Sequence, residues 1–430
     1  MENKPNQPTI DRIEQFLQEM IEKLEPNRRE PVGRGRPRIL PAMCLWAGVL
    51  VCVLRGWNSQ LEIWRLLHEK QLWDYPRFPI SDQAVYKRLE QGGEGPLKSL
   101  FEQASQVLKE HLLPYSQKLA EFASEVVAID ATTLDKVLRH LPVLRSKEEG
   151  DPALLAGKLV GVYDIRLQQW RHVEYVENPN ENERVKAPSL LEHIQKEALI
   201  LMDRGFLSFS WFDQLTQEGY HWITRLSKNT SYKVVHTYYQ QGYTFDGLIQ
   251  LGAYRADRAR YIVRLVTFRV GETTHQYITN VIDPHLLSMH NIAVLYARRW
   301  DIEMAFKLIK RELGLHIFWS GKPVVILQQI WAVLLISQIW HGIQLEIAGK
   351  AGVDPFDVSL PLLVTHIPAW KDVDFIALAV EGGRDVGFIR PSRRIRIQTP
   401  EIDIRDYQPL PQDIPLVITP RYAHRRSDLN

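Results

Sequence analysis

Four side chains in the run YARRWDIEMAFKLIKRELGL are of the types that act together on phosphate groups. They are Tyr296, Arg299, Glu303 and Lys310, at offsets of 0, 3, 7 and 14 residues. Each residue of an α-helix turns by about 100°, so these four positions fall within about 60° of one another. A carboxylate flanked by phosphate-binding cations on one helical stripe indicates a metal-dependent enzyme acting on a nucleic-acid backbone.

Two aspartates upstream can complete a metal site with Glu303. EVVAID ends at Asp130 and ALILMD ends at Asp203, each after an apolar run typical of a buried strand. Either aspartate alone is more typical of a turn. Together with Glu303, their order along the chain predicts a three-carboxylate site. Carboxylate oxygens suit Mg²⁺ or Mn²⁺, and two such ions about 4 Å apart can catalyse phosphodiester cleavage.

These segments resemble the DDE transposases of bacterial insertion sequences. The matching segments are AIDATTLD, LMDRGF and LYARRWDIEMAFKLIKRELGL, and the resemblance is best from about Glu125 to Leu315. The Y-(2)-R-(3)-E-(6)-K spacing points to the insertion-sequence-four family. The resemblance implies an RNase H-like catalytic core. It also implies a catalytic and metal-binding set of Asp130, Asp203 and Glu303, and DNA contacts from Tyr296, Arg299 and Lys310.

The resemblance implies cut-and-paste transposition with two Mg²⁺ or Mn²⁺ ions. Its steps are cleavage at the element ends, hairpin formation and opening, and strand transfer to target DNA. The implied partners are the terminal inverted repeats, the target DNA and a second copy of the chain in a synaptic homodimer. Two alternatives stay open: a nuclease with the same RNase H-like fold, and a domesticated transposase that only binds DNA.

Two further residues of the signature segment are secondary DNA-binding candidates. Lys307 lies on the same helical stripe, and Trp300 either stacks on DNA or packs in the core, with packing favoured. In the inserted region, tyrosines alternate with basic residues, a composition that suits an unstacked DNA end and is equally common in ordinary sheets. No tryptophan lies between Trp222 and Trp300, so the sequence does not show which residue would hold a flipped base.

The composition is that of an ordinary globular protein of 430 residues, with a net charge of only +2. Basic residues concentrate locally instead, in residues 28–40, 225–275 and 384–430. The only cysteines, Cys44 and Cys52, argue against a disulfide framework and fit a reducing cytoplasm. Apolar stretches at 40–54 and 330–347 are too short or too interrupted for membrane spans. Together with the resemblance, which implies a bacterial and nucleoid-associated protein, these features predict a cytoplasmic location.

The periodicity predicts a mixed α/β (α+β) fold in four regions. Residues 1–120 show only helical patterns, with Ser59 and Ser81 as helix caps, and form a DNA-binding or dimerisation region. Residues 121–227 and 287–320 form an RNase H-like core, three consecutive strands followed by alternating helix and strand. Residues 228–286 form a β-rich insertion. Residues 321–430 form a helical region and a basic tail, which is extended, disordered or a strap over a partner subunit.

Overall fold

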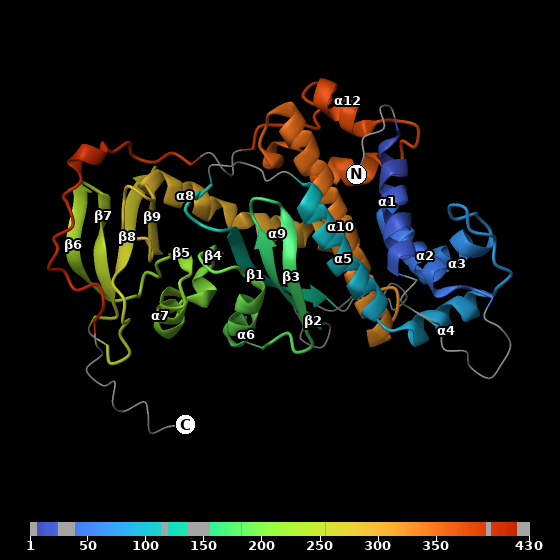
Figure 1. The fold of residues 1–430 in the computed structure, drawn as a ribbon, viewed down its shortest axis with the longest axis horizontal. Coiled ribbons are helices and arrows are strands. Elements are labelled where there is room, and N and C mark those ends of the chain that lie inside the picture. Colours follow the sequence, from blue (N-terminus) through green and yellow to red (C-terminus); the bar gives the residue numbers. More distant parts are fainter. Residues whose placement is uncertain are drawn as a thin grey trace.

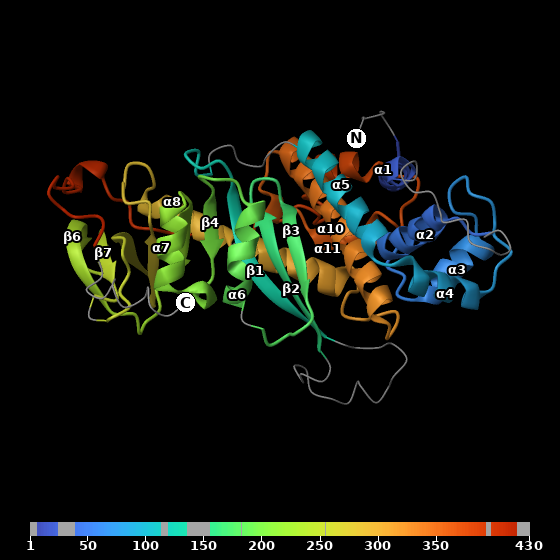
Figure 2. The ribbon, with the colours of Figure 1, turned by 60° about the horizontal axis from the view of Figure 1, so that its bottom comes forward.

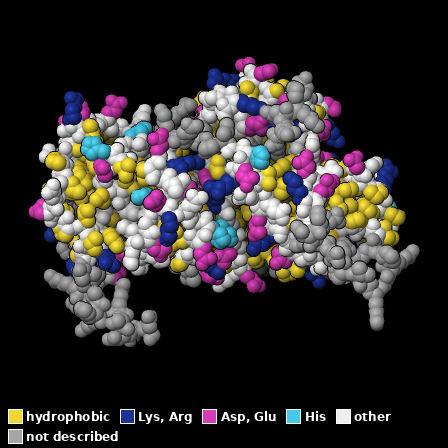
Figure 3. Space-filling view, in the orientation of Figure 1, with side chains coloured by type: hydrophobic (Ala, Val, Ile, Leu, Met, Phe, Trp, Pro, Cys, Tyr) yellow, Lys and Arg dark blue, Asp and Glu magenta, His cyan; other side chains and the backbone are white. Residues whose placement is uncertain are grey.

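The computed structural model describes residues 7–24, 39–112, 119–135, 155–181, 183–253, 255–392 and 397–418. The basic linker before Pro41 and the end of the tail lie mostly outside these residues. The molecule is elongated, with N-terminal helices at one end, a sheet through the centre and the insertion at the other end (Figure 1). Lys and Arg side chains are interspersed with Asp and Glu on the face of Figure 3, as the small net charge predicts.

Nine strands of the described chain form one continuous sheet, in the order β3-β2-β1-β4-β5-β9-β8-β7-β6. Their bounds are β1 (Val126–Asp135), β2 (Leu155–Asp164), β3 (Gln169–Val176), β4 (Leu199–Met202), β5 (His221–Arg225), β6 (Tyr232–Gln241), β7 (Thr244–Leu251), β8 (Val263–Val270) and β9 (Thr273–Thr279). β1, β2 and β3 are antiparallel neighbours, and β4 and β5 run parallel to β1. This is the predicted meander followed by parallel strands, and it confirms the RNase H-like fold class.

The insertion strands extend the core sheet. β9 pairs antiparallel with β5, with Ile223 opposite Thr279, and β8, β7 and β6 follow outward. Without β9, β5 would end the sheet with unpaired backbone groups, which proteins normally cover. The backbone of the insertion is therefore hydrogen-bonded to that of the core.

Successive residues of a central strand face opposite sides of the sheet and pack in two different hydrophobic cores. In β1, Val126 and Ala128 join one core, whereas Val127 and Ile129 join the other. Both faces of the central strands are thus buried, which explains their nearly continuous apolar runs. Helices α6 (Glu183–Leu190) and α7 (Phe209–Gln217) cover one face, and α8 (Met289–Arg298) and α9 (Trp300–Lys307) cover the other (Figure 2).

The N-terminal helices pack on two long helices, α5 (Gly95–His111) and α10 (Pro323–Ala351). The predicted caps are confirmed: Ser59 accepts a hydrogen bond from the amide of Leu61, and Ser81 from that of Ala84. Cys44 and Cys52 are buried free thiols. The helices are α1 (Thr9–Leu24), α2 (Ala42–Leu54), α3 (Gln60–His68) and α4 (Asp82–Gly92).

Helix α10 is long and apolar enough to cross a membrane by length and composition, but 83% of its most apolar window is buried inside the protein. Its polar residues explain this placement. The side-chain amide of Gln338 accepts a hydrogen bond from the Trp170 amide and donates one to the Trp170 carbonyl, which joins α10 to β3. Helices α11 (Leu360–His366) and α12 (Phe375–Gly382) pack beside it.

The described part of the tail is extended and packs on the insertion strands of its own chain (Figure 1). The Ile262 amide donates to the Leu416 carbonyl at 2.9 Å, and the Gln408 amide to the Tyr238 carbonyl at 2.8 Å. The Tyr407 hydroxyl donates to the buried carboxylate of Asp246 at 3.0 Å. Residues 407–418 thus act as an intramolecular strap.

Candidate active site

The first two predicted carboxylates lie at neighbouring positions just beyond the parallel pairing of β1 with β4, although β1 itself continues to Asp135. β1 and β4 are parallel, and Ile129 pairs with Met202. The next residue on β1 is Asp130, and the residue directly after β4 is Asp203. Because parallel strands run in register about 4.8 Å apart, the two aspartates reach the same edge of the sheet together.

The signature segment is not the single regular helix that its spacing predicts. Ser288 caps α8, but α8 ends at Arg298, α9 begins at Trp300, and Arg299 forms the junction. The Arg299 amide donates to the Tyr296 carbonyl, three residues back, instead of four. After α9, Leu308–Glu312 form a π-helical turn, η6. The predicted continuous stripe is therefore wrong at these two points.

The π-helical turn affects the position of Lys310. A π turn inserts extra residues into a helix and re-aims the side chains that follow, and such turns are frequent at functional sites. Here the Lys310 ammonium donates to the Thr133 carbonyl of β1 at 2.9 Å. Lys310 therefore lies next to the strand that carries Asp130.

Arg299 joins two of the three carboxylates. Its Nη1 lies 2.6 Å from Glu303 Oε1 and 3.5 Å from Asp130 Oδ2. The Arg299 side chain is only 6% exposed, so the guanidinium is enclosed between strand β1 and helix α9. Asp130 and Glu303, 173 positions apart in the chain, thus reach a single cationic nitrogen.

The environment of Asp130 disfavours a negative charge. Burial raises its pKa to about 7, and the nearby charges of Glu303 and Asp203 act in the same direction. The Ala131 amide, which donates to Asp130 Oδ1 at 2.8 Å, and the Arg299 guanidinium oppose this rise. A cation bound beside Asp130 would therefore favour the charged form of this buried carboxyl.

This donor set fits a hard divalent cation. Among the described residues, no three His, Cys, Asp or Glu side chains are grouped closely enough to hold a metal ion as they stand. Asp130 and Glu303 nevertheless already reach one cationic nitrogen, and Asp203 lies beside Asp130 by strand register. Carboxylate oxygens are the ligands that Mg²⁺ and Mn²⁺ prefer.

The remaining candidates differ in exposure. Tyr296 is buried, its ring centroid lies 5.7 Å from the Arg299 guanidinium, and burial raises its pKa to about 12. Its hydroxyl has no hydrogen-bond partner among the residues that the structure describes. Trp300 is 50% exposed, so the favoured expectation that it packs in the core is wrong. Lys307 is exposed on the same helix.

The geometry described above lies within a recognised protein family. Residues 121–339, about half of the chain, match the family described as Transposase DDE domain. The chain belongs to this DDE transposase family. The matched span contains Asp130, Asp203 and Glu303 and also the whole insertion.

Two curated relatives of this DDE transposase domain are themselves transposases. Transposase InsG for insertion sequence element IS4 from Escherichia coli (strain K12) is 28% identical over 166 residues, 36% of this chain and 36% of that protein. Putative transposase y4zB from Sinorhizobium fredii (strain NBRC 101917 / NGR234) is 24% identical over 149 residues, 33% of this chain and 41% of that protein. The chain thus spans about two fifths or less of the relatives that it matches.

One solved structure matches most of the chain at low sequence identity. It is a cryo-EM structure of the piggyBac transposase synaptic complex with hairpin DNA, matched with a TM-score of 0.42 and 10% identity. The match covers 88% of this chain and 82% of that chain.

A polar cavity beside Asp203 adds residues that sequence reasoning missed. The cavity has a volume of about 500 Å³ and opens between the loop after β4 and the loop after β5 of the DDE domain. Arg204 follows Asp203 directly in LMDRGF, which was the available signal for it. Arg255 belongs to the basic residues that alternate with tyrosines in the inserted region, but that composition did not place it beside Asp203. Asn229 had no signal, because folding alone brings it there. The lining residues are Asp203, Arg204, Gly205, Leu207, Phe209, Ser227, Asn229, Thr230 and Arg255.

Proposed function

We propose that this protein is a metal-dependent transposase that cuts DNA at the ends of an insertion sequence and joins those ends to target DNA. The observation that carries the proposal is the convergence of Asp130 and Glu303 on one cationic nitrogen, beside Asp203, inside a DDE transposase domain. The curated relatives, both transposases, support the same substrate class.

In this proposal Asp130, Asp203 and Glu303 hold two Mg²⁺ or Mn²⁺ ions. Bound divalent ions would activate the attacking water or 3′-hydroxyl and stabilise the leaving oxygen. The three carboxylates supply oxygen ligands from three elements, and burial around Asp130 limits competing water. The divalent ions would also favour the charged form of the Asp130 carboxyl.

The basic residues of the signature segment bind DNA phosphates in the proposed complex. Arg299 has a planar, bidentate guanidinium suited to a phosphate, and Lys310 offers a point charge beside β1. The Tyr296 hydroxyl is a buried donor next to Arg299, available to a ligand oxygen. Trp300 and Lys307 are exposed on the same helix, where they would contact the DNA flanking the cleavage point.

The wider assembly follows from the reaction. Both ends of an element must be cut together, so we propose a homodimer on two terminal inverted repeats, in the cytoplasm at the nucleoid. Residues 1–120 would bind DNA or the second subunit, and residues 228–286 would contact the DNA end. In-line attack at the same site serves end cleavage, hairpin formation and opening, and strand transfer.

The decisive experiment compares cleavage by the wild type and by Glu303→Gln. The substrate is a labelled duplex carrying the inverted repeat that flanks the gene, incubated with Mg²⁺ or Mn²⁺. We expect end-specific cleavage by the wild type and its loss in the variant. Glu218→Gln is the matched control, because Glu218 is a surface carboxylate paired with Lys196 and precedes β5, at the opposite end of the parallel strands from Asp203. Binding without cleavage by the wild type would favour a protein that only binds DNA.

A further inference from the structure

Two acidic residues of α9 point in opposite directions. Asp301 and Glu303 are two residues apart, which on a helix turns their side chains by about 200°. The Glu303 side chain is 32% exposed and meets Arg299 at the candidate site. Asp301 is 1% exposed and points into the protein, away from any solvent or substrate. The buried carboxylate therefore belongs to the support of the site.

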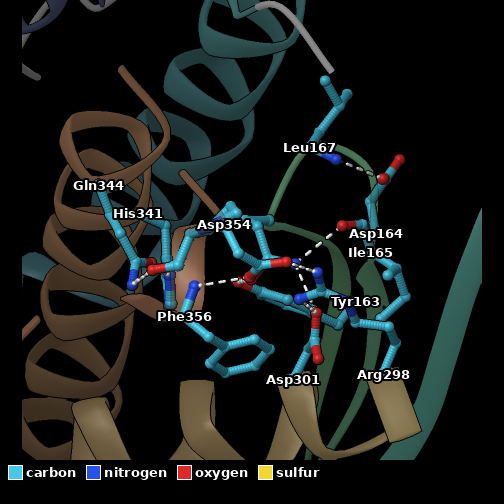
Figure 4. A network of polar contacts seen from close by, with 12 residues as sticks. Tyr163, Asp164, Ile165, Leu167, Arg298, Asp301, His341, Gln344, Asp354 and Phe356 are labelled. Atoms are coloured by element: carbon cyan, nitrogen blue, oxygen red, sulfur yellow. Dashed lines mark hydrogen bonds and ion pairs between the residues drawn. The ribbon is translucent and has the colours of Figure 1, made fainter. Parts of the chain in front are cut away.

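Asp301 contacts two elements that flank it in space. The Gln168 side-chain amide donates to Asp301 Oδ2 at 2.6 Å. Arg298 Nη1 lies 3.7 Å from the same oxygen (Figure 4). Gln168 belongs to the turn between β2 and β3 and also donates to the Ile165 carbonyl at 2.8 Å. Its φ of +52° is rare for a residue with a side chain, so this turn is built around that amide. Asp301 thus fixes α9 to the β2–β3 turn.

Arg298 carries the network to the C-terminal region. Its Nη2 pairs with the Asp354 carboxylate, and its guanidinium lies 5.1 Å from the centre of the Phe356 ring. Asp354 in turn accepts from the Phe356 amide at 2.9 Å. Arg298 is the last residue of α8 and Asp301 lies in the first turn of α9, so the two residues flank the junction at Arg299.

Stability alone does not explain a charged network at this position. A buried ion pair contributes little more than well-packed apolar side chains of similar size, whereas removing one partner leaves a costly unpaired charge. Directional contacts, unlike apolar ones, define how far a helix is rotated. The contacts of Asp301 define the rotation of α9, the helix that carries Glu303. The residue at the start of this helix, Arg299, contacts both Glu303 and Asp130.

We propose that Asp301 and Arg298 are positioning residues for the catalytic site: their buried contacts set the rotation of α9 and the kink at Arg299, and so the distance between Glu303 and Asp130. This inference rests on the function proposed above. Partners that orient metal ligands without touching the metal typically change metal affinity or activity by 10- to 100-fold when they are mutated.

The first test is Asp301→Asn, which keeps the shape and the hydrogen bond from Gln168 but removes the charge opposite Arg298. We expect the cleavage rate at saturating DNA to fall by about 10- to 100-fold, and the affinity for Mn²⁺ alone, measured by calorimetry, to fall by about tenfold. The affinity for the terminal duplex stays at the wild-type value. A variant that was only less stable would not lose cleavage rate and Mn²⁺ affinity while it kept the DNA affinity of the wild type.

The matched control is Glu218→Gln. Glu218 also combines an ion pair, with Lys196 at 3.1 Å, and a hydrogen bond from a neutral side chain, Gln214 at 2.8 Å, but it lies just before β5, outside the Asp301 network. We expect its cleavage rate and Mn²⁺ affinity to match those of the wild type at temperatures where the variant is folded.

If Asp301→Asn does not fold, Arg298→Lys is the second test, because it keeps a cation between Asp301 and Asp354 but loses the planar guanidinium. We expect this folded variant to cleave slowly as well. Wild-type cleavage and Mn²⁺ affinity in either folded variant overturn the inference. The wild type and Glu303→Gln are measured in the same experiments. If the wild type neither cleaves DNA nor binds Mn²⁺ through Glu303, the proposed function is wrong. If the wild type is active and the variants are equally active, only the positioning role is wrong.

Discussion

Arg299 Nη1 lies 2.6 Å from Glu303 Oε1, and the same nitrogen is 3.5 Å from Asp130 Oδ2. In the DNA-free protein a side-chain cation thus contacts two of the carboxylates proposed to bind metal. A divalent ion between these carboxylates experiences the like charge of the guanidinium. A DNA phosphate, by contrast, offers the guanidinium a bidentate partner. Metal binding and DNA binding are therefore expected to favour each other, because such coupling is reciprocal.

Arg299→Gln is expected to bind Mn²⁺ about tenfold more tightly than the wild type without DNA, a change of about 1.4 kcal/mol. The variant removes the competing cation but leaves all three carboxylates. Calorimetric titration of the DNA-free protein with Mn²⁺ measures this, and Arg299→Lys, which keeps the charge, is the control. Weaker Mn²⁺ binding by Arg299→Gln would show that the guanidinium organises the carboxylates and does not compete with the metal.

A second prediction concerns pH and His341. Burial lowers the pKa of this histidine to about 4, against about 6.5 in an unfolded chain. Between these values the unfolded state binds the extra proton, so the protein loses stability as pH falls from about 6.5 towards 4. His341→Gln removes this loss. When the pH falls from 7.5 to 5, the free energy of unfolding should therefore decrease by about 2 kcal/mol more in the wild type than in the variant.

Urea unfolding at a series of pH values measures this shift. His285→Gln, at an exposed histidine, is the control and should follow the wild-type curve. A His341→Gln curve parallel to that of the wild type from pH 7.5 to 5 would mean that His341 is accessible to protons in the folded state.

The carboxylates were predictable from the sequence because their signals are local. A buried strand shows as a short apolar run, and Asp130 and Asp203 each end such a run. The order of the strands then follows from the meander and the parallel crossovers. The extension of the sheet by β9 was not visible, because the pairing of Ile223 with Thr279 depends on distant segments.

The details of the signature segment were less predictable because tertiary contacts decide them. A 3.6-residue period carries no signal for the junction at Arg299 or for the π turn that brings Lys310 to Thr133. Trp300 shows the limit of residue type as a guide, since a large apolar side chain is half exposed on this helix. The contact of Asp301 with Gln168 spans 133 positions and was also missed.

A third prediction tests the C-terminal strap. Tyr407→Phe removes the hydroxyl that donates to the fully buried carboxylate of Asp246, which also pairs with Arg264 at 2.6 Å. A hydrogen bond to a charged group contributes about 1.5–3 kcal/mol, so the free energy of unfolding measured in urea should fall by that amount. Tyr239→Phe, whose hydroxyl bonds Gln241 at an exposed position, is the control. Equal stability of Tyr407→Phe and wild type would mean that the strap is undocked in solution.

The fourth prediction concerns the role of Lys310 in DNA binding. Lysines that neutralise phosphates release counterions, so each contributes about one unit to the slope of log affinity against log salt concentration. Lys310→Met is expected to reduce this slope by about one for the terminal duplex. Lys307→Met should reduce it by less, because Lys307 is exposed and lies directly before the π segment, about one helical turn from Lys310. Fluorescence anisotropy at several salt concentrations measures the slope. Lys196→Met, at a surface lysine paired with Glu218, is the control. An unchanged slope in Lys310→Met would mean that Lys310 does not contact DNA and only donates to the Thr133 carbonyl. The phosphate contacts would then come from Arg299 and the exposed cations around Asp203.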